Sequence, residues 1–187
     1  TLDNPVTAGN FISVQYFGSI QVTDPSTCTS NNGNTVNRGP GDRVGFGGTL
    51  NTFYVYNANS GSTTFTCSGI ASGPSVIITE YSGVINTEDP LITSGQTTGS
   101  AIPLQTSITN SSKALLIMGL FNRDYDFVSL VGPVTLSINT TTGAGEAIVI
   151  AENLDASTGT NNNTNYNWTF QGGNPNNGNQ IGPYTVN

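Results

Sequence analysis

The most constraining feature of the chain is a series of short runs rich in β-branched and aromatic residues, each ended by Gly, Pro, Asn or Ser. Such runs are typical of short strands joined by turns. No helical periodicity persists along any of them, so the sequence predicts an all-β protein. We predict strands over residues 11–17, 19–23, 50–56, 63–68, 75–81, 101–108, 113–121, 134–138, 146–152, 166–170 and 181–186.

Several runs alternate between two kinds of side chain. Val134, Leu136 and Ile138 share one face of a predicted strand, and Thr and Ser separate them. Alternation of this kind gives one buried and one solvated face, as in packed antiparallel sheets. We therefore predict a two-sheet antiparallel β-sandwich of jelly-roll or immunoglobulin-like type. We assign residues 1–17 to an N-terminal extension strand and residues 18–187 to the sandwich domain.

The low charge of the chain excludes some partners. Charged residues make up 8% of the sequence, and four Lys and Arg stand against eleven Asp and Glu, for a net charge of −7. A phosphate backbone would be repelled and no basic stripe is present, so we expect no nucleic-acid partner. No apolar run approaches the ~20 residues of a membrane span, so we expect none.

Several features point to export. The chain is poor in Lys, rich in Asn and Thr, and begins at Thr1 without Met, so we expect a removed leader and an extracellular, cell-surface location. Cys28 and Cys67 form an isolated pair, which in an exported protein is most simply one disulfide. The alternative is two buried thiols.

The sequence offers little to a catalytic mechanism. It has no His, which removes Ser–His and Cys–His nucleophilic sites, and it contains no phosphate-binding loop or dinucleotide fingerprint. Glu80, Glu146 and Glu152 lie on predicted strands, where carboxylates are usually solvated. We expect no enzyme, no catalytic residue and no cofactor.

A calcium site is the strongest metal candidate. Asn122, Asp124 and Asp126 alternate, which could aim three oxygens at Ca²⁺. The pattern lacks the Gly and final Glu of an EF-hand loop, and Arg123 lies between the acids. We interpret the segment as an exposed polar turn and predict no metal site.

Acceptor sequences for N-linked glycans form the richest local signal. Each Asn-x-Ser/Thr sequence falls at a predicted strand end or in a loop, where a bulky glycan can project. The candidate asparagines are Asn110, Asn139, Asn162 and Asn167.

A set of short segments resembles a broad group of secreted jelly-roll domains on microbial surfaces. The segments occur in order between Val6 and Phe170 and include 6–10, 22–24 with 33–35, 54–57, 64–66, 78–84 and 114–117. The resemblance implies the fold and carries no active-site residue.

The N-terminus resembles that of archaeal thread filament subunits, which are pilins linked by donor-strand complementation. Leu2, Val6 and Ala8 at even spacing, followed by the run 11–17, carry the resemblance. It implies a homopolymer in which one copy's N-terminal strand completes the next copy's sheet. The intersubunit residues would be Leu2, Val6, Ala8, Phe11, Ile12, Val14 and Tyr16. The run 181–186 is the alternative donor.

The leading hypothesis is therefore a structural subunit of an extracellular filament. The alternative is a carbohydrate-binding jelly-roll module, because such sites stack sugars on exposed aromatic rings. Trp168 with Tyr166, or Tyr54 with Tyr56, are the candidate platforms.

We predict that the native protein carries glycans, first at Asn139 and Asn167. Intact-mass measurement of protein from its own host should give a mass above the 19.4 kDa of the bare chain. A mass equal to the bare chain would exclude glycosylation.

Overall fold

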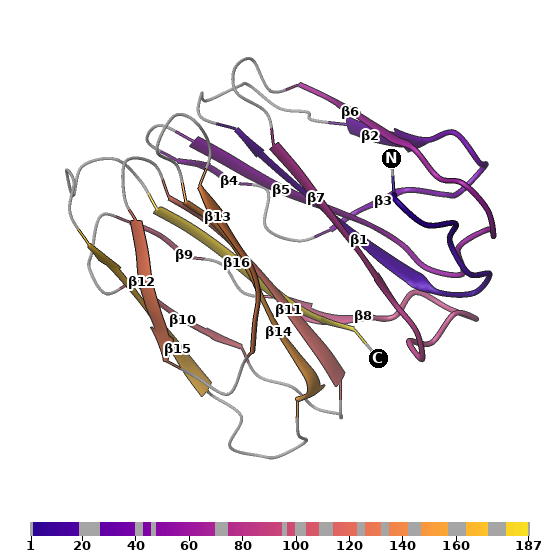
Figure 1. The fold of residues 1–187 in the computed structure, drawn as a ribbon. Coiled ribbons are helices and arrows are strands. Elements are labelled where there is room, and N and C mark those ends of the chain that lie inside the picture. The colour runs from indigo at the N-terminus through magenta and orange to yellow at the C-terminus, as the bar shows by residue number, and fades with distance from the viewer. Residues whose placement is uncertain are drawn as a thin grey trace.

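A computed structural model describes residues 2–18, 27–39, 43–45, 48–69, 75–94, 97–99, 104–108, 114–122, 126–131, 135–141, 147–156, 164–171 and 179–186. These residues form antiparallel sheets and contain no helix (Figure 1). The prediction of an all-β chain is thus confirmed for the described residues.

The first sheet holds the N-terminal strand at its centre. Its order is β3-β5-β1-β7, and β4 also pairs with β5. Each strand of this sheet pairs antiparallel with its neighbour. The strands are β1 (Phe11–Gly18), β3 (Asn37–Arg38), β4 (Arg43–Gly45), β5 (Gly48–Val55) and β7 (Ser75–Tyr81).

The second sheet contains the most apolar run of the chain. Its order is β13-β14-β11-β16-β8, and β9 also pairs with β16. The central β11 lies between β14 and β16, and its Gly119 stands directly opposite Gly182 of β16. The strands are β8 (Leu91–Ser94), β9 (Thr97–Gly99), β11 (Ala114–Asn122), β13 (Thr135–Thr141), β14 (Ala147–Ala156) and β16 (Asn179–Val186).

Two smaller sheets complete the described strands. β2 (Thr27–Ser30) and β6 (Phe65–Ser68) form a two-stranded ribbon. β10 (Leu104–Ile108), β15 (Thr164–Gln171) and β12 (Asp126–Val131) form a three-stranded sheet in that order. In Figure 1 the ribbon lies beside the first sheet, and the three-stranded sheet lies at the opposite end of the molecule.

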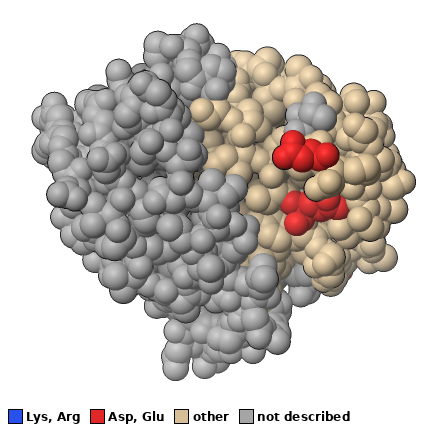
Figure 2. All heavy atoms as spheres, in the orientation of Figure 1, with Lys and Arg blue, Asp and Glu red and all other residues tan. Residues whose placement is uncertain are grey.

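The strands β1 and β5 of the first sheet are buried on both faces. On one face their side chains meet those of the second sheet in an inner cluster, made of Phe11, Phe17, Leu50, Tyr54, Leu115, Ile117 and Val186. On the other face they meet the ribbon and the N-terminal segment in an outer cluster, made of Val6, Ile12, Val14, Tyr16, Cys28, Phe53, Val55 and Ala58. Figure 2 shows acidic side chains on one face of the described part, where none of the described residues in view is a Lys or Arg.

The longer strands follow the sequence prediction closely. The expected strands 11–17, 50–56 and 75–81 appear as β1, β5 and β7, because alternating or continuous apolar runs mark buried strands. The apolar run 113–121 becomes β11, a central strand as predicted. The expected strand 19–23 lies outside the described residues.

No strand is predicted between residues 23 and 50, yet this segment contains β2, β3 and β4. These strands have two to four residues and are rich in Thr, Asn, Arg and Gly, so they carry no hydrophobic period. Their pairing comes from neighbours that the tertiary fold supplies. Three further strands, β8, β9 and β12, were also not predicted.

The disulfide prediction is confirmed. Cys28 of β2 and Cys67 of β6 are direct cross-strand partners with Cα atoms 4.0 Å apart, and their sulfurs are bonded. The bond joins the two strands of the ribbon. Cys28 also belongs to the outer cluster, so the bonded pair packs against the first sheet.

Replacing both Cys28 and Cys67 by Ala should lower the free energy of unfolding by ~4 kcal/mol, because the bond closes a loop with a sequence separation of 39. Urea unfolding followed by circular dichroism measures the change. The control replaces Thr29 and Thr66 by Ala. These exposed residues are the neighbouring cross-strand pair in the same ribbon. If the control loses as much stability as the cysteine variant, the bond is not what stabilises the ribbon.

Candidate functional site

The residues expected to form an intersubunit strand divide into two parts. Residues 2–10 form an irregular segment, and a regular strand, β1, begins only at Phe11. Gly9 has a positive φ of 84°, which glycine adopts readily and which turns the chain into the strand. The expectation of one continuous strand over 1–17 therefore needs correction, because the turn at Gly9 separates the two parts.

Pro5 is exposed and lies before the turn, outside β1, so its missing backbone donor does not interrupt the pairing of β1.

In the single chain, β1 is the central strand of the first sheet. It pairs with β5 on one side and with β7 on the other over nearly its whole length. Val14, for example, stands opposite Phe53 of β5 and Ile78 of β7. Both backbone edges of β1 are thus occupied. Pairing of this segment with another copy concerns the assembled state and stays a prediction.

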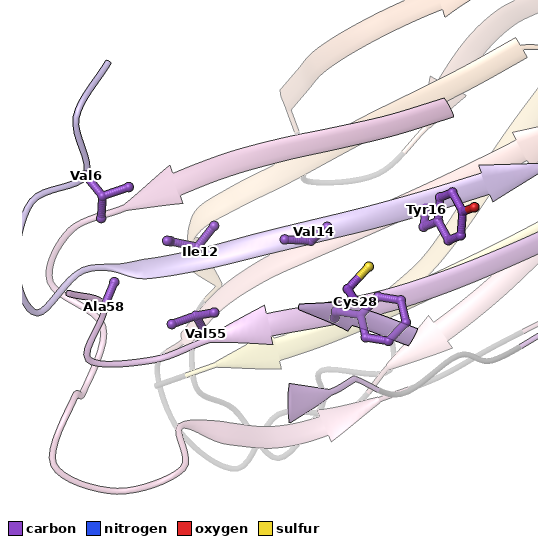
Figure 3. Packing of buried hydrophobic residues seen from close by; sticks show 8 residues of the cluster. Val6, Ile12, Val14, Tyr16, Cys28, Val55 and Ala58 are labelled. Carbon is purple, nitrogen blue, oxygen red and sulfur yellow. The ribbon is translucent and has the colours of Figure 1, made fainter. Parts of the chain in front are cut away.

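The outer face of β1 carries three of the predicted residues. Ile12, Val14 and Tyr16 alternate along the strand and are buried in the outer cluster (Figure 3). Figure 3 shows Val55 beside them on β5, and Val6 and Ala58 covering one end. Burial of a large apolar side chain contributes ~1.5–3 kcal/mol, so this face alone stabilises β1 strongly.

The N-terminal segment closes over the edge of the outer cluster. Val6 is buried and makes an isolated bridge with Gly61, with backbone N–O distances of 2.9 and 3.0 Å. The backbone N of Leu2 donates to the carbonyl oxygen of Thr63 at 3.1 Å. Ala8, which had been expected to share a face with Leu2 and Val6, is exposed, because the turn toward Gly9 breaks the alternation.

A carboxylate on β7 holds the end of this segment. Glu80 accepts hydrogen bonds at one oxygen from the backbone N of Thr7, at 2.9 Å, and from the side-chain amide of Asn10, at 2.7 Å. Glu80 had been weighed as one of a pair of catalytic carboxylates. Here it joins the N-terminal segment to β7, and Glu146 lies outside the described residues.

The inner face of β1 contains polar residues that the sequence prediction did not single out. Phe11, Ser13, Gln15 and Phe17 alternate there, and all four are buried. Gln15 is 1% exposed, and neither atom of its amide has a hydrogen-bond partner. Thr52, its direct partner on β5, is also buried with an unpartnered hydroxyl. An unpartnered buried polar group costs ~1–3 kcal/mol, so these residues oppose stability. The sequence signal that could have identified this site is a Gln within a run that is otherwise apolar except for Ser13.

The aromatic platform expected at Tyr54 and Tyr56 is not open to a sugar at Tyr54. That ring is 3% exposed and stacks between Phe11 and Tyr56. Its hydroxyl donates to Asp89, with distances of 2.8 and 3.0 Å to the two carboxylate oxygens. Burial, and then this hydrogen bond, raises the pKa of Tyr54. The other pair, Tyr166 and Trp168, lies in β15, whose side chains are outside the described part.

The glycan acceptors lie partly within strands. Asn139 pairs with Val149 in β13, and Asn167 lies in the middle of β15. We had expected Asn139 just beyond a strand, but β13 extends to Thr141. Asn110 and Asn162 lie outside the described residues.

The described residues offer no metal centre or membrane helix. Among them, no three His, Cys, Asp or Glu side chains come close enough to hold a metal ion. The calcium candidates Asn122 and Asp126 end β11 and begin β12, and Asp124 is not described. No helix long and apolar enough to cross a membrane occurs in this part of the chain.

Comparison with protein-family models, with curated proteins and with solved structures finds no match to this chain.

Substituting Val14 by Asp should lower the free energy of unfolding by at least ~3 kcal/mol, because it buries an unpaired charge in the outer cluster. Ala8→Asp, on the exposed part of the same N-terminal region, should change it by less than ~0.5 kcal/mol. Urea unfolding compares the two. Equal effects would mean that β1 is not buried as described.

Proposed function

We propose that this protein is a β-sandwich of jelly-roll or immunoglobulin-like type that serves as the structural subunit of an extracellular, N-glycosylated filament. Copies would polymerise head to tail, each donating the strand β1 to the sheet of the next. The proposal agrees with the resemblance of the N-terminus to archaeal thread filament subunits.

One observation carries the proposal: β1 is first among the described strands in sequence and central in space. A strand near a chain end can leave its sheet without rearranging the order of the other strands. Its departure would open a slot between β5 and β7, with an unpaired backbone edge on each side. The β1 of another copy fits that slot by the same pairing.

The energy of such a slot favours refilling it. β1 contributes Phe11, Ile12, Val14, Tyr16 and Phe17 to the two clusters, all at 3% exposure or less. Leaving these sites empty would forfeit ~1.5–3 kcal/mol for each side chain. A β1 strand from a second copy restores the same contacts. Exchange therefore links two subunits and leaves the packing around β1 the same as in the single chain.

The geometry of exchange gives an open chain of subunits. The donating strand and the accepting slot are different surfaces, so the contact is heterologous, and it extends into a filament where the rotation between copies does not close a ring. The disulfide of the ribbon lies in the accepting body and holds part of the outer cluster in place when β1 is absent. Disulfides persist in oxidising surroundings, which agrees with a cell-surface location.

A cysteine pair across β1 and β7 tests the proposal in the full chain. Val14 and Ile78 are cross-strand partners, so Val14→Cys with Ile78→Cys should form a bond wherever β1 docks. In assembled protein, we expect a ladder of linked copies on non-reducing denaturing gels, which collapses on reduction.

The matched control is Ala114→Cys with Ala156→Cys, a partner pair between β11 and β14 within the body. It should link within one chain and leave a single band. If the Val14–Ile78 pair in assembled protein also gives only linked monomers, β1 stays in its own chain and the strand-exchange proposal fails.

A further inference from the structure

The second sheet has no side chain at the point where it faces Gln15, because Gly119 lies there. A side chain at Gly119 of β11 would collide with the Gln15 amide, because a Cβ built there overlaps the Oε1 atom. Gly119 is directly opposite Gly182 of β16, and opposite residues of paired strands share a face. The residues Leu115 and Ile117, which alternate with Gly119 along β11, belong to the inner cluster on that face. We call Gly119 and Gly182 the glycine pair.

We infer that the fit of Gln15 over the glycine pair sets the register of β1, and thereby selects which strand the sheet accepts. The inference rests on the proposed function only where the strand comes from a second copy. The fit applies equally to β1 in its own chain.

The register of β1 needs such a device, because other features discriminate weakly. Sliding an antiparallel strand by two residues keeps every side chain on its face and restores the backbone ladder. On the outer face, Ile12, Val14 and Tyr16 would mostly replace one another, and only at one end would Asn10 or Gly18 enter. That face therefore tolerates a slip better than the inner face does.

On the inner face, by contrast, successive residues differ in size and polarity. A slip by two would bring Ser13 or Phe17 over the glycine pair and take Gln15 away from it. Serine would leave a void, and the phenylalanine ring is bulkier than the amide it would replace. The Gln15 amide has no partner in the observed register either, so the amide itself does not discriminate between registers. Only the observed register places a side chain of fitting length over the glycine pair.

The same fit defines the partner. The accepted strand is a second copy of this chain, or one with an unbranched side chain at the position of Gln15 between two aromatic residues. A β-branched residue at that position would be too short to reach Gly119, and an aromatic ring would be too bulky for the space that the amide fills. Apolar strands of other proteins would thus be rejected although they match both faces in polarity.

Disulfide trapping in the full chain measures the register. Val14→Cys with Ile78→Cys reports the observed register, and Val14→Cys with Val76→Cys reports a slip by two residues. Mass spectrometry of non-reduced digests gives the ratio of the slipped bond to the observed one. With Gln15 present, we expect the slipped bond to be rare.

Gln15→Ser leaves over the glycine pair, in the observed register, the same void that Ser13 leaves there in the slipped one, so it should raise that ratio about tenfold. Gly119→Ala, which fills the bare site, should raise it as well. The control is Thr52→Val, which removes the buried hydroxyl opposite Gln15 and leaves the glycine pair untouched, so the ratio should stay unchanged.

An unchanged ratio in both Gln15→Ser and Gly119→Ala would overturn the inference, and so would an equal rise in Thr52→Val. If Gly119→Ala does not fold, Gln15→Ser still decides, because a shorter side chain adds no clash. The gel separates this outcome from the proposed function: bonds within or between copies test strand exchange, whereas the ratio of the two bonds tests register.

Discussion

Closure of β1 on both faces and along both edges is the constraint on which the described fold depends. The inner cluster joins the two large sheets through Phe11 and Phe17. The outer cluster joins the first sheet to the ribbon through Ile12, Val14 and Tyr16. The two large sheets and the ribbon therefore all pack around one eight-residue strand. Any process that moves β1 acts on all of them together.

The proposed specificity of β1 comes at a cost in stability. An apolar residue at Gln15 and a side chain at Gly119 would each suit a sheet interior better in isolation, because buried amides and strand glycines are both unfavourable. The two departures meet at one point, where each permits the other. Natural sequences depart from local rules most often where function requires it, which agrees with a strand that must be recognised.

The sequence allowed the long strands and the disulfide to be predicted, and it left the arrangement of the sheets open. Apolar runs identify β1, β5, β7 and β11 because both faces of these strands are buried or alternate. The short β2, β3 and β4 have no such pattern. The meeting of Gln15 with Gly119 depends on which sheets face each other, a tertiary property that no local pattern contains.

The ladders on both sides of β1 also determine how a connection through this strand would bear mechanical load. Their hydrogen bonds run perpendicular to the strand. A force along the axis of β1 would load all of them at once in shear, whereas a force across it would open them one by one. Beyond the strand, the disulfide joins Cys28 to Cys67, 39 positions apart in sequence, so tension cannot extend the chain between them. A filament joined through β1 would thus be stiff along its length.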